Sequence, residues 1–482
     1  MVRNRVALLL LATVAGLVLV PTTSAHAAPA LTWSRCGALE CGTLTVPLDD
    51  ATPDAGTVDI AVARRPAMNP ARRIGSLVVN PGGPGVPAID FLRASFASFP
   101  RALRERFDLV AFDPRGVGKS SQIVCADSLD PLFDESFSPR TEAERTALVS
   151  AARDVATECA ERSGALLAHV STQATARDLD RLRGALGDER LTFIGSSYGS
   201  YLGALYVTLY RDRVRAIVLD GAIDPEQTAA EALVSQARGF EDELDAFLAD
   251  CDARHECAFS AGRSSAGDAY DALRERAVRA PIRAKGTDGR RLNETRFDAA
   301  VLETLYSGRS AWRGLADALA RADRGDAADL LARADAFTWR KADGGQNHVL
   351  DAFWAISCLD GPEPGPLGAA GLERLAALSA ARLGAFVANN SVICSVWPVA
   401  PVAPPPALDA AGAPTVLIVG ATGDPATPLA AGRSMQRVLG NARLLVVDGY
   451  RHTSFLGGNE CVDATVTSYL VDHELPARGA RC

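Results

Sequence analysis

The sequence has no surplus of positive charge and no pattern that would hold a metal. Its 482 residues include 50 Lys and Arg against 58 Asp and Glu, so the net charge at pH 7 is −8. An acidic chain is repelled by phosphate groups, so nucleic acid and anionic membranes are not expected as partners. No Cys-x-x-Cys spacing or Cys/His ladder indicates zinc. We therefore expect neither a metal nor an organic cofactor.

Long apolar runs are missing outside the N-terminus. There, Arg3 and Arg5 precede the apolar residues 6–20, and Ala-His-Ala at 25–27 offers a cleavage site between small residues. This pattern predicts a signal peptide at residues 1–27. An uncleaved membrane anchor is the alternative, although the run is short for a bilayer span. We expect a secreted, extracellular protein with no membrane attachment after cleavage.

Ten cysteines all follow the predicted cleavage site. An even number of cysteines in an exported chain predicts disulfide bonds. Sequence alone does not settle the pairing, and the simplest hypothesis joins neighbours in order. The expected pairs are Cys36–Cys41, Cys125–Cys159, Cys251–Cys257, Cys358–Cys394 and Cys461–Cys482.

Short apolar runs alternate with helical stretches over most of the chain. Several of these runs are continuous, as in strands that are covered on both faces. Such alternation predicts an α/β fold with a mostly parallel, doubly wound sheet. The pattern breaks between 226 and 406, where Ala, Leu, Arg and Asp recur with helical spacing. We predict a core made of residues 28–225 and 407–482 and an inserted helical cap at 226–406. An independent second domain without a role at the site is the alternative.

Ser197 is the strongest candidate for a nucleophile. It lies in Gly-Ser-Ser-Tyr-Gly at 195–199, after an apolar run at 191–194 and before a helical segment. Strand, G-x-S-x-G turn and helix together predict a nucleophile elbow, which exposes the serine hydroxyl at the carboxyl edge of a sheet. The pentapeptide alone is weak support, because Gly and Ser are common in tight turns.

A serine nucleophile needs a base and an acid, which in an α/β-hydrolase follow in the order Ser, Asp/Glu, His. Asp424 follows an expected strand at 415–419, and His452 occupies the loop after the next one. Asp448 competes with Asp424 but lies too close to His452 along the same loop. We predict the catalytic triad Ser197–Asp424–His452.

An oxyanion site also requires backbone N–H groups near the serine. We expect one from Tyr198 and one from Gly82 or Gly83, in the loop Asn-Pro-Gly-Gly-Pro-Gly at 80–85. This loop lacks G-x-G-x-x-G spacing and a P-loop lysine, which argues against a nucleotide site.

With these residues in place, the chain resembles secreted actinobacterial tripeptidyl aminopeptidases of the α/β-hydrolase superfamily, relatives of proline iminopeptidase. The resemblance spans nearly the whole chain after the signal. Its motifs are Asn-Pro-Gly-Gly-Pro-Gly at 80–85, Asp-Pro-Arg-Gly-Val-Gly at 113–118, Gly-Ser-Ser-Tyr-Gly at 195–199, Gly-Asp-Pro-Ala-Thr-Pro at 423–428 and His452. Proline iminopeptidases usually carry His where this chain has Pro81, which agrees better with the tripeptidyl group.

The resemblance implies a serine peptidase that releases short peptides, tripeptides in particular, from free N-termini. Such specificity requires an anion that holds the substrate's ammonium group. Asp360 is our first choice because it lies beside Cys358, and Glu241 is the second, with Asp242 and Glu243 as further candidates. A carboxylesterase with the same triad is the alternative function, and a non-catalytic relative would have lost a triad residue. We expect a monomer whose partners are peptides with a free N-terminus.

Overall fold

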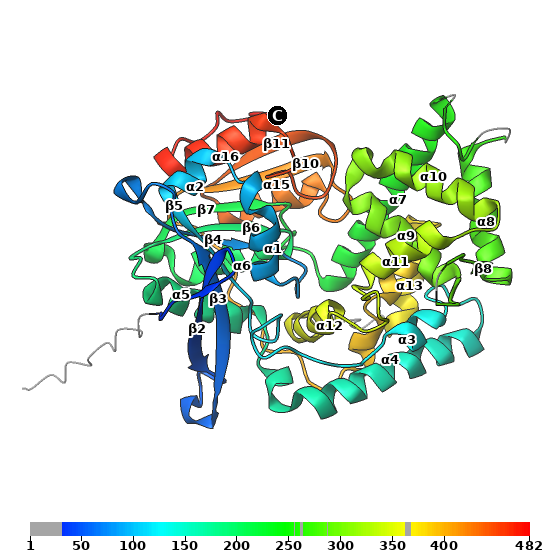
Figure 1. Cartoon of the computed structure of the whole chain (residues 1–482), viewed down its shortest axis with the longest axis horizontal. Helices are drawn as coiled ribbons and strands as arrows, with labels where there is room; N and C mark the ends of the chain where they lie inside the picture. Colours follow the sequence, from blue (N-terminus) through cyan, green and yellow to red (C-terminus); the bar gives the residue numbers. More distant parts are fainter. Residues whose placement is uncertain (1–30, 255, 261–263, 287, 362–367) are drawn as a thin grey trace, which may run out of the picture.

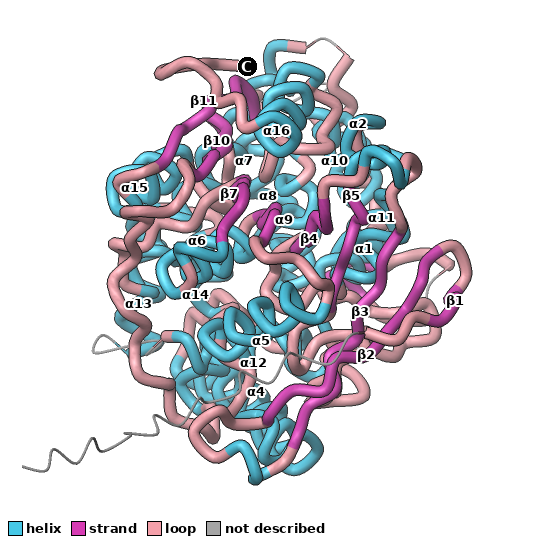
Figure 2. The backbone as a smooth tube through the Cα atoms, turned by 90° about the vertical axis from the view of Figure 1, so that its left-hand side faces the viewer, coloured by secondary structure: helices cyan, strands magenta, loops and turns pink. Residues whose placement is uncertain are grey.

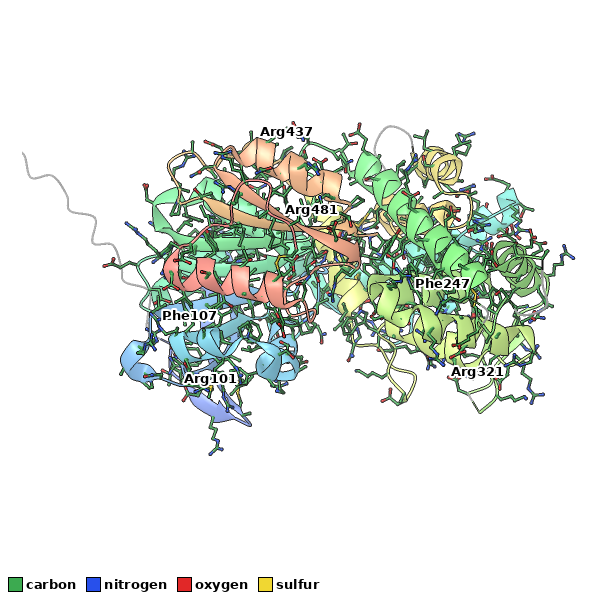
Figure 3. All side chains as sticks on the ribbon, turned by 90° about the horizontal axis from the view of Figure 1, so that it is seen from above. Arg101, Phe107, Phe247, Arg321, Arg437 and Arg481 are labelled. Carbon is green, nitrogen blue, oxygen red and sulfur yellow. A yellow bond between two sulfur atoms is a disulfide. The ribbon has the colours of Figure 1, made fainter. Side chains whose placement is uncertain are left out.

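The computed structural model describes residues 31–254, 256–260, 264–286, 288–361 and 368–482. The predicted signal peptide lies outside these residues. Figure 1 shows two lobes, one built on a large sheet and one made of helices, and Figure 3 places Phe107 in the first and Phe247 in the second. In the part of the chain that is described, no helix is long and apolar enough to cross a membrane.

A nine-stranded sheet forms the first lobe, in the order β1-β2-β3-β5-β4-β6-β7-β10-β11. The strands from β5 to β11 along this order pair in parallel, whereas β1, β2 and β3 pair antiparallel at one edge. This mostly parallel sheet confirms the predicted fold class. The bounds are β1 Ser34–Cys36, β2 Leu39–Pro47, β3 Thr57–Arg65, β4 Gly75–Asn80, β5 Phe107–Phe112, β6 Leu191–Ser196, β7 Val214–Asp220, β10 Val416–Gly423 and β11 Ala442–Tyr450.

Helices cover both faces of the sheet, which explains the continuous apolar strands. All six residues of β4 and of β5 are buried, because successive side chains enter opposite cores. Val78 joins the core under one group of helices, and Leu77 and Val79 join the other. The first group is α5 (Thr172–Ala185), α6 (Tyr198–Leu209) and α15 (Leu429–Leu439); the second is α1 (Ala88–Ser95), α2 (Arg101–Arg106) and α16 (Glu460–Asp472).

The second lobe is the helical insertion, which begins at a well-defined N-cap. Thr228 accepts from the Glu231 N–H, and the Glu231 carboxylate accepts from the Thr228 N–H at 2.8 Å, so a capping box starts α7. The insertion also contains a two-stranded sheet, β8 (Ile282–Arg283) with β9 (Arg291–Leu292). Its helices are α7 Ala229–Ala253, α8 Ala266–Arg279, α9 Glu294–Tyr306, α10 Trp312–Asp323, α11 Ala328–Phe337, α12 Val349–Asp360, α13 Gly368–Ser379 and α14 Gly384–Asn389.

The division of the chain into a core and a cap stays a prediction. One segment of the expected core packs on the cap and not on the sheet. Helices α3 (Asp130–Asp134) and α4 (Glu142–Ser163) fall within the expected core part 28–225, yet they pack on the cap (Figures 1 and 2). The Phe137 and Phe386 rings lie 5.5 Å apart, and Arg145 binds Glu373 with both guanidinium nitrogens. The apolar face of α4 therefore completes the core of the cap.

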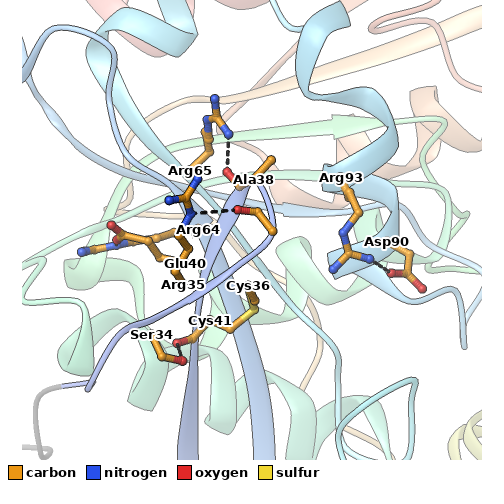
Figure 4. The surroundings of a disulfide bond; sticks show 11 residues. Ser34, Arg35, Cys36, Ala38, Glu40, Cys41, Arg64, Arg65, Asp90 and Arg93 are labelled. Atoms are coloured by element: carbon orange, nitrogen blue, oxygen red, sulfur yellow. Dashed lines mark hydrogen bonds and ion pairs between the residues drawn. A yellow bond between two sulfur atoms is a disulfide. The ribbon is translucent and has the colours of Figure 1, made fainter.

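The structure forms the five expected disulfide bonds, and no described cysteine is free. Cys36–Cys41 closes the β1–β2 edge of the sheet (Figure 4). Cys358–Cys394 joins the end of α12 to the 3-10 turn Val392–Val396, 36 residues further along the chain. It therefore holds the last turn of α12, which carries Asp360.

We predict that removing the Cys358–Cys394 bond destabilises the protein without unfolding it. The double variant Cys358→Ser, Cys394→Ser should lose about 3 kcal/mol of unfolding free energy, because the open loop gains entropy in the unfolded chain. Denaturant unfolding followed by circular dichroism measures this change. An unchanged midpoint, or two free thiols at these positions in the untreated wild type, would contradict the assignment.

Candidate active site

Ser197 occupies a strained turn between β6 and α6. Its φ of 54° and ψ of −122° are rare for a residue with a side chain. The turn is held because the Ser197 N–H donates to the Asp220 carbonyl at 2.8 Å. A Cβ on Gly195 would stand 2.0 Å from the Gly199 carbonyl oxygen, so only glycine fits there. The geometry is that of the predicted nucleophile elbow.

Asp424 and His452 meet at the same edge of the sheet. Asp424 follows β10, His452 follows β11, and Nδ1 of His452 lies 2.9 and 3.1 Å from the two Asp424 oxygens. Burial acts to lower the pKa of His452, but the Asp424 charge and hydrogen bond outweigh it and the pKa is raised. The acid and the base that the sequence predicts are therefore brought together, with the imidazole oriented as a general base requires.

Thr427 is a further partner of this pair that the sequence did not reveal. Its hydroxyl donates to Asp424 Oδ2 at 3.0 Å and lies 3.4 Å from His452 Nδ1. The Ala426 and Thr427 N–H groups donate to Asp424 Oδ1 at 3.0 and 2.9 Å. With these donors the buried carboxylate is fixed in one orientation toward the imidazole.

Ser197 and His452 lie on either side of the segment Asp220–Gly221. Ser197 bonds to the Asp220 carbonyl, and a Cβ on Gly221 would lie 3.4 Å from Cε1 of His452. Among the described residues no hydrogen bond joins the Ser197 hydroxyl to His452. Such bonds often tighten only when substrate is bound, so the arrangement is compatible with a nucleophile and its base.

Asp220 is a second buried carboxylate at the site, and sequence reasoning missed it. Its side chain accepts from the Ser454 N–H at 2.8 Å and from the Phe455 N–H at 2.8 Å, so it holds the loop of His452. Burial raises the pKa of Asp220 to about 6 although these hydrogen bonds oppose it. Its charge also helps to raise the pKa of His452. The sequence did offer a signal for this residue. Asp220 ends an apolar strand, much as Asp424 follows one.

The glycine loop after β4 contacts the turn of Ser197, but one of its expected oxyanion donors already has a hydrogen-bond partner. A Cβ on Gly82 would stand 3.3 Å from the Tyr198 nitrogen, so loop and elbow are in contact. The Gly82 N–H donates to Asn80 Oδ1 at 3.0 Å and is not available to an oxyanion. Gly82 is therefore withdrawn as a donor, and the Tyr198 and Gly83 N–H groups remain our proposed pair.

The cap lies directly on the histidine loop. The His452 N–H donates to the Tyr306 carbonyl at 3.3 Å, and the two rings meet edge to face at 5.5 Å. Close by, a Cβ on Gly308 would stand 1.9 Å from the Tyr450 carbonyl oxygen, so the backbones touch where glycine is required. The end of α9 is thus part of the wall of the site.

Asp360 lies near the nucleophile, linked to it through Thr172. The Thr172 N–H donates to Asp360 Oδ1 at 2.9 Å, and its hydroxyl contacts both Asp360 Oδ2 and the Tyr198 hydroxyl. Burial raises the pKa of Asp360 to about 6, against the lowering effect of the Thr172 hydrogen bonds. Through Thr172 the carboxylate is connected to the side chain of Tyr198, the residue that follows Ser197.

The other three cap acids have different surroundings, and of these Glu243 lies close enough to Asp424 for the Asp424 charge to help raise its pKa. Both Glu241 oxygens accept from the Arg382 N–H at 3.1 Å, and one also accepts from the Leu383 N–H, so this carboxylate orders the turn before α14. Asp242 is exposed, with 71% of its side chain accessible. Glu243 is buried against the Trp312 N–H, and burial raises its pKa to about 8. Glu241 is corrected from a substrate ligand to a helix-end acceptor.

A family model described as the alpha/beta hydrolase fold matches residues 75–458. The chain belongs to the α/β-hydrolase fold family. Serine protease Hip1 of Mycobacterium tuberculosis (strain ATCC 25618 / H37Rv) is 36% identical over 461 residues, which cover 92% of this hydrolase and 87% of the relative. Carboxylesterase B of the same strain is 36% identical over 480 residues, or 94% and 90% of the two chains.

Tripeptidyl aminopeptidase of Streptomyces lividans is 31% identical to this hydrolase over 475 residues, which cover 93% of this chain and 86% of the relative. Among solved structures, the proline iminopeptidase of Mycobacterium smegmatis is similar with a TM-score of 0.37 and 15% identity, over 89% of this chain and 98% of that one. All three curated relatives match the hydrolase over nearly its full length.

We predict that Asp220→Asn moves the acidic limb of the pH profile of kcat/KM to lower pH. The reaction needs neutral His452, so activity is present above the pKa of His452 and is lost as the pH falls through it. Removing the Asp220 charge lowers that pKa. We also expect kcat/KM at the optimum to fall roughly tenfold, because the histidine loop loses a charged acceptor.

Asp463→Asn is the matched control. Asp463 accepts from the Leu456 N–H at 3.0 Å in the same loop, but its charge is not among those that raise the pKa of His452. The acidic limb of the pH profile of Asp463→Asn should stay at the same pH as that of the wild type. If the two variants shift the limb equally, Asp220 supports the loop without acting on the imidazole.

Proposed function

We propose that this protein is a secreted serine peptidase that releases short peptides, chiefly tripeptides, from free N-termini through an acyl-enzyme. The observation that carries the proposal is the Asp424–His452 pair placed at the sheet edge beside the strained turn of Ser197. The relatives named serine protease and tripeptidyl aminopeptidase support peptide substrates. The five disulfide bonds and the N-terminal segment support secretion.

In the proposed mechanism the Ser197 hydroxyl attacks the carbonyl carbon of the scissile peptide bond. His452 Nε2 takes the hydroxyl proton, and Asp424 holds Nδ1 and stabilises the imidazolium. The Tyr198 and Gly83 N–H groups stabilise the oxyanion of the tetrahedral intermediate. His452 then gives its proton to the leaving amine, and the C–N bond breaks. Water, deprotonated by His452, hydrolyses the ester and restores the serine.

Asp360 is the proposed anchor for the substrate's ammonium group. Its contacts run through Thr172 to Tyr198, the residue after Ser197, and we propose that a short acyl segment reaches from Ser197 to this carboxylate. Three residues in extended conformation reach about 10 Å. Its two oxygens each accept one hydrogen bond, from the Thr172 N–H and hydroxyl, which leaves lone pairs for a cation. A longer N-terminal extension would meet α12 and the cap.

An esterase is the second candidate, and one observation favours it. The relative named Carboxylesterase B is as similar to this chain as the one named serine protease. The same triad cleaves esters, whose alkoxide is the better leaving group, so the triad geometry does not separate the two substrates. Dependence on a free amine does.

We predict that Ser197→Ala abolishes turnover and active-site labelling by a fluorophosphonate. Without the hydroxyl no acyl-enzyme forms, and the loss of kcat should be about a millionfold, or down to the background of the assay. Mass spectrometry of the labelled wild type should locate the probe on the peptide that contains Ser197. Labelling of another serine in the variant would overturn the assignment of the nucleophile.

We predict that a tripeptide amide with a free N-terminus is cleaved at least about tenfold faster, in kcat/KM, than its N-acetylated form, because acetylation removes the charge that Asp360 holds. Asp360→Asn should raise KM for the free peptide and leave the acetylated one unchanged. Asp242→Asn, an exposed acid of the same cap, is the control. An equal rate on both peptides would favour the esterase, and an unchanged KM in Asp360→Asn would exclude Asp360 as the anchor.

A further inference from the structure

Helices α9 and α11 pack side by side and leave a cavity of about 360 Å³ between their accessible faces. Glu303 and Thr304 of α9 line one wall together with Ser307, which follows this helix, and Asp329 and Arg333 of α11 line the other. Figure 1 shows both helices in the middle of the cap, with α8 and β8 beyond them. We refer to this cavity as the α9–α11 groove.

Two of the groove's charged groups are unpaired. Within the described part of the chain, the half-buried Glu303 carboxylate has no hydrogen bond and no ion pair. The Arg333 guanidinium donates to the Thr304 hydroxyl at 2.9 Å and makes no ion pair among the same residues. Asp329, by contrast, is paired with Arg321, which is labelled on the cap in Figure 3. A half-buried charge without a partner is costly, so a built groove of this kind suits a charged ligand.

The groove lies next to the catalytic histidine. Glu303 and Tyr306 are three residues apart on α9, so they share one face of the helix. Tyr306 packs its ring on His452 and accepts the His452 N–H. Burial raises the pKa of Tyr306, and the charges of Glu303 and Asp424 raise it further, which places both carboxylates near this ring. A ligand at Glu303 would therefore be one helical turn from Tyr306, whose ring contacts His452.

We propose that Glu303 binds the cationic side chain of a lysine or arginine in the peptide substrate. The proposal rests on the proposed peptidase function. Glu303 is the carboxylate of the groove that has no hydrogen bond and no ion pair among the described residues, and Arg333 lies too far away to pair with it directly. Arg333 still favours the ionised form of Glu303, because its charge opposes the effect of burial on the Glu303 pKa.

The experiment compares peptides of equal length that differ only in charge. Acetylated peptides carry either norleucine or lysine at successive positions. We expect lysine at one of these positions to raise kcat/KM of the wild type about tenfold, and Glu303→Gln to remove that gain while neutral peptides keep their rate. Glu161→Gln, an exposed glutamate on α4, should change neither. Arg333→Gln should strengthen the preference for the cation two- to threefold, because it removes a competing charge.

Affinities measured with the Ser197→Ala protein, with and without Glu303→Gln, separate this proposal from the proposed function. Binding of a cationic peptide that depends on Glu303, without turnover in the wild type, would support the groove and contradict the peptidase. Turnover with no cation preference, or a preference that survives Glu303→Gln, would overturn the groove and leave the peptidase standing. An equal loss for charged and neutral peptides would show that Glu303 serves the fold.

Discussion

One buried residue at the end of β7 joins the two halves of the candidate site. The Asp220 carbonyl holds the N–H of Ser197, and its carboxylate holds the N–H groups of Ser454 and Phe455. The strained turn of Ser197 and the loop of His452 are therefore both anchored on the same residue. A displacement of about 1 Å between reacting groups can slow a reaction about a hundredfold. A shared anchor therefore helps to keep the two groups at a constant separation. The Asp424–His452 bond orients the imidazole only while this loop stays in place.

The cap contacts the loop of His452, so it forms part of the wall of the site as well as covering it. Tyr306 contacts His452 through ring and carbonyl, and Gly308 brings two backbones into contact. Helices α3 and α4 then complete the apolar core of the cap from the other part of the chain. Because these contacts make the cap part of the wall of the site, the proposed choice of substrate depends on the side chains that the cap presents, as Asp360 and Glu303 illustrate.

The sequence predicted what depends on local pattern and chain order. The sheet, the elbow at Ser197 and the loops that carry Asp424 and His452 follow from strand ends, turn residues and spacing. The five disulfide pairs match the simplest hypothesis of neighbours joined in order, although the sequence alone does not settle the pairing. It did not predict features that depend on contacts across space. The Gly82 amide looked available until Asn80 was placed beside it, and Glu241 looked free until the turn at Arg382 covered it. Arg145 on α4 is separated from its cap partner Glu373 by 228 residues of chain, so the place of α4 in the cap could not be inferred.

The carboxylates of the site can be sorted by the donors that surround them. Asp424, Asp220 and Glu241 each accept two or more backbone N–H bonds, which fixes them and leaves little for a substrate. Asp360 accepts one N–H and one hydroxyl, and Glu303 accepts none within the described residues. A buried carboxylate with few hydrogen-bond donors recovers little of the free energy that it loses on leaving water. The attraction for an external cation therefore rises from the first three acids to Asp360 and Glu303. Asp360 contacts Tyr198 through Thr172, and Glu303 lies one helical turn from Tyr306, which contacts His452. Acids at these places suit the proposed short substrate, which would carry its charge close to the bond that is cut.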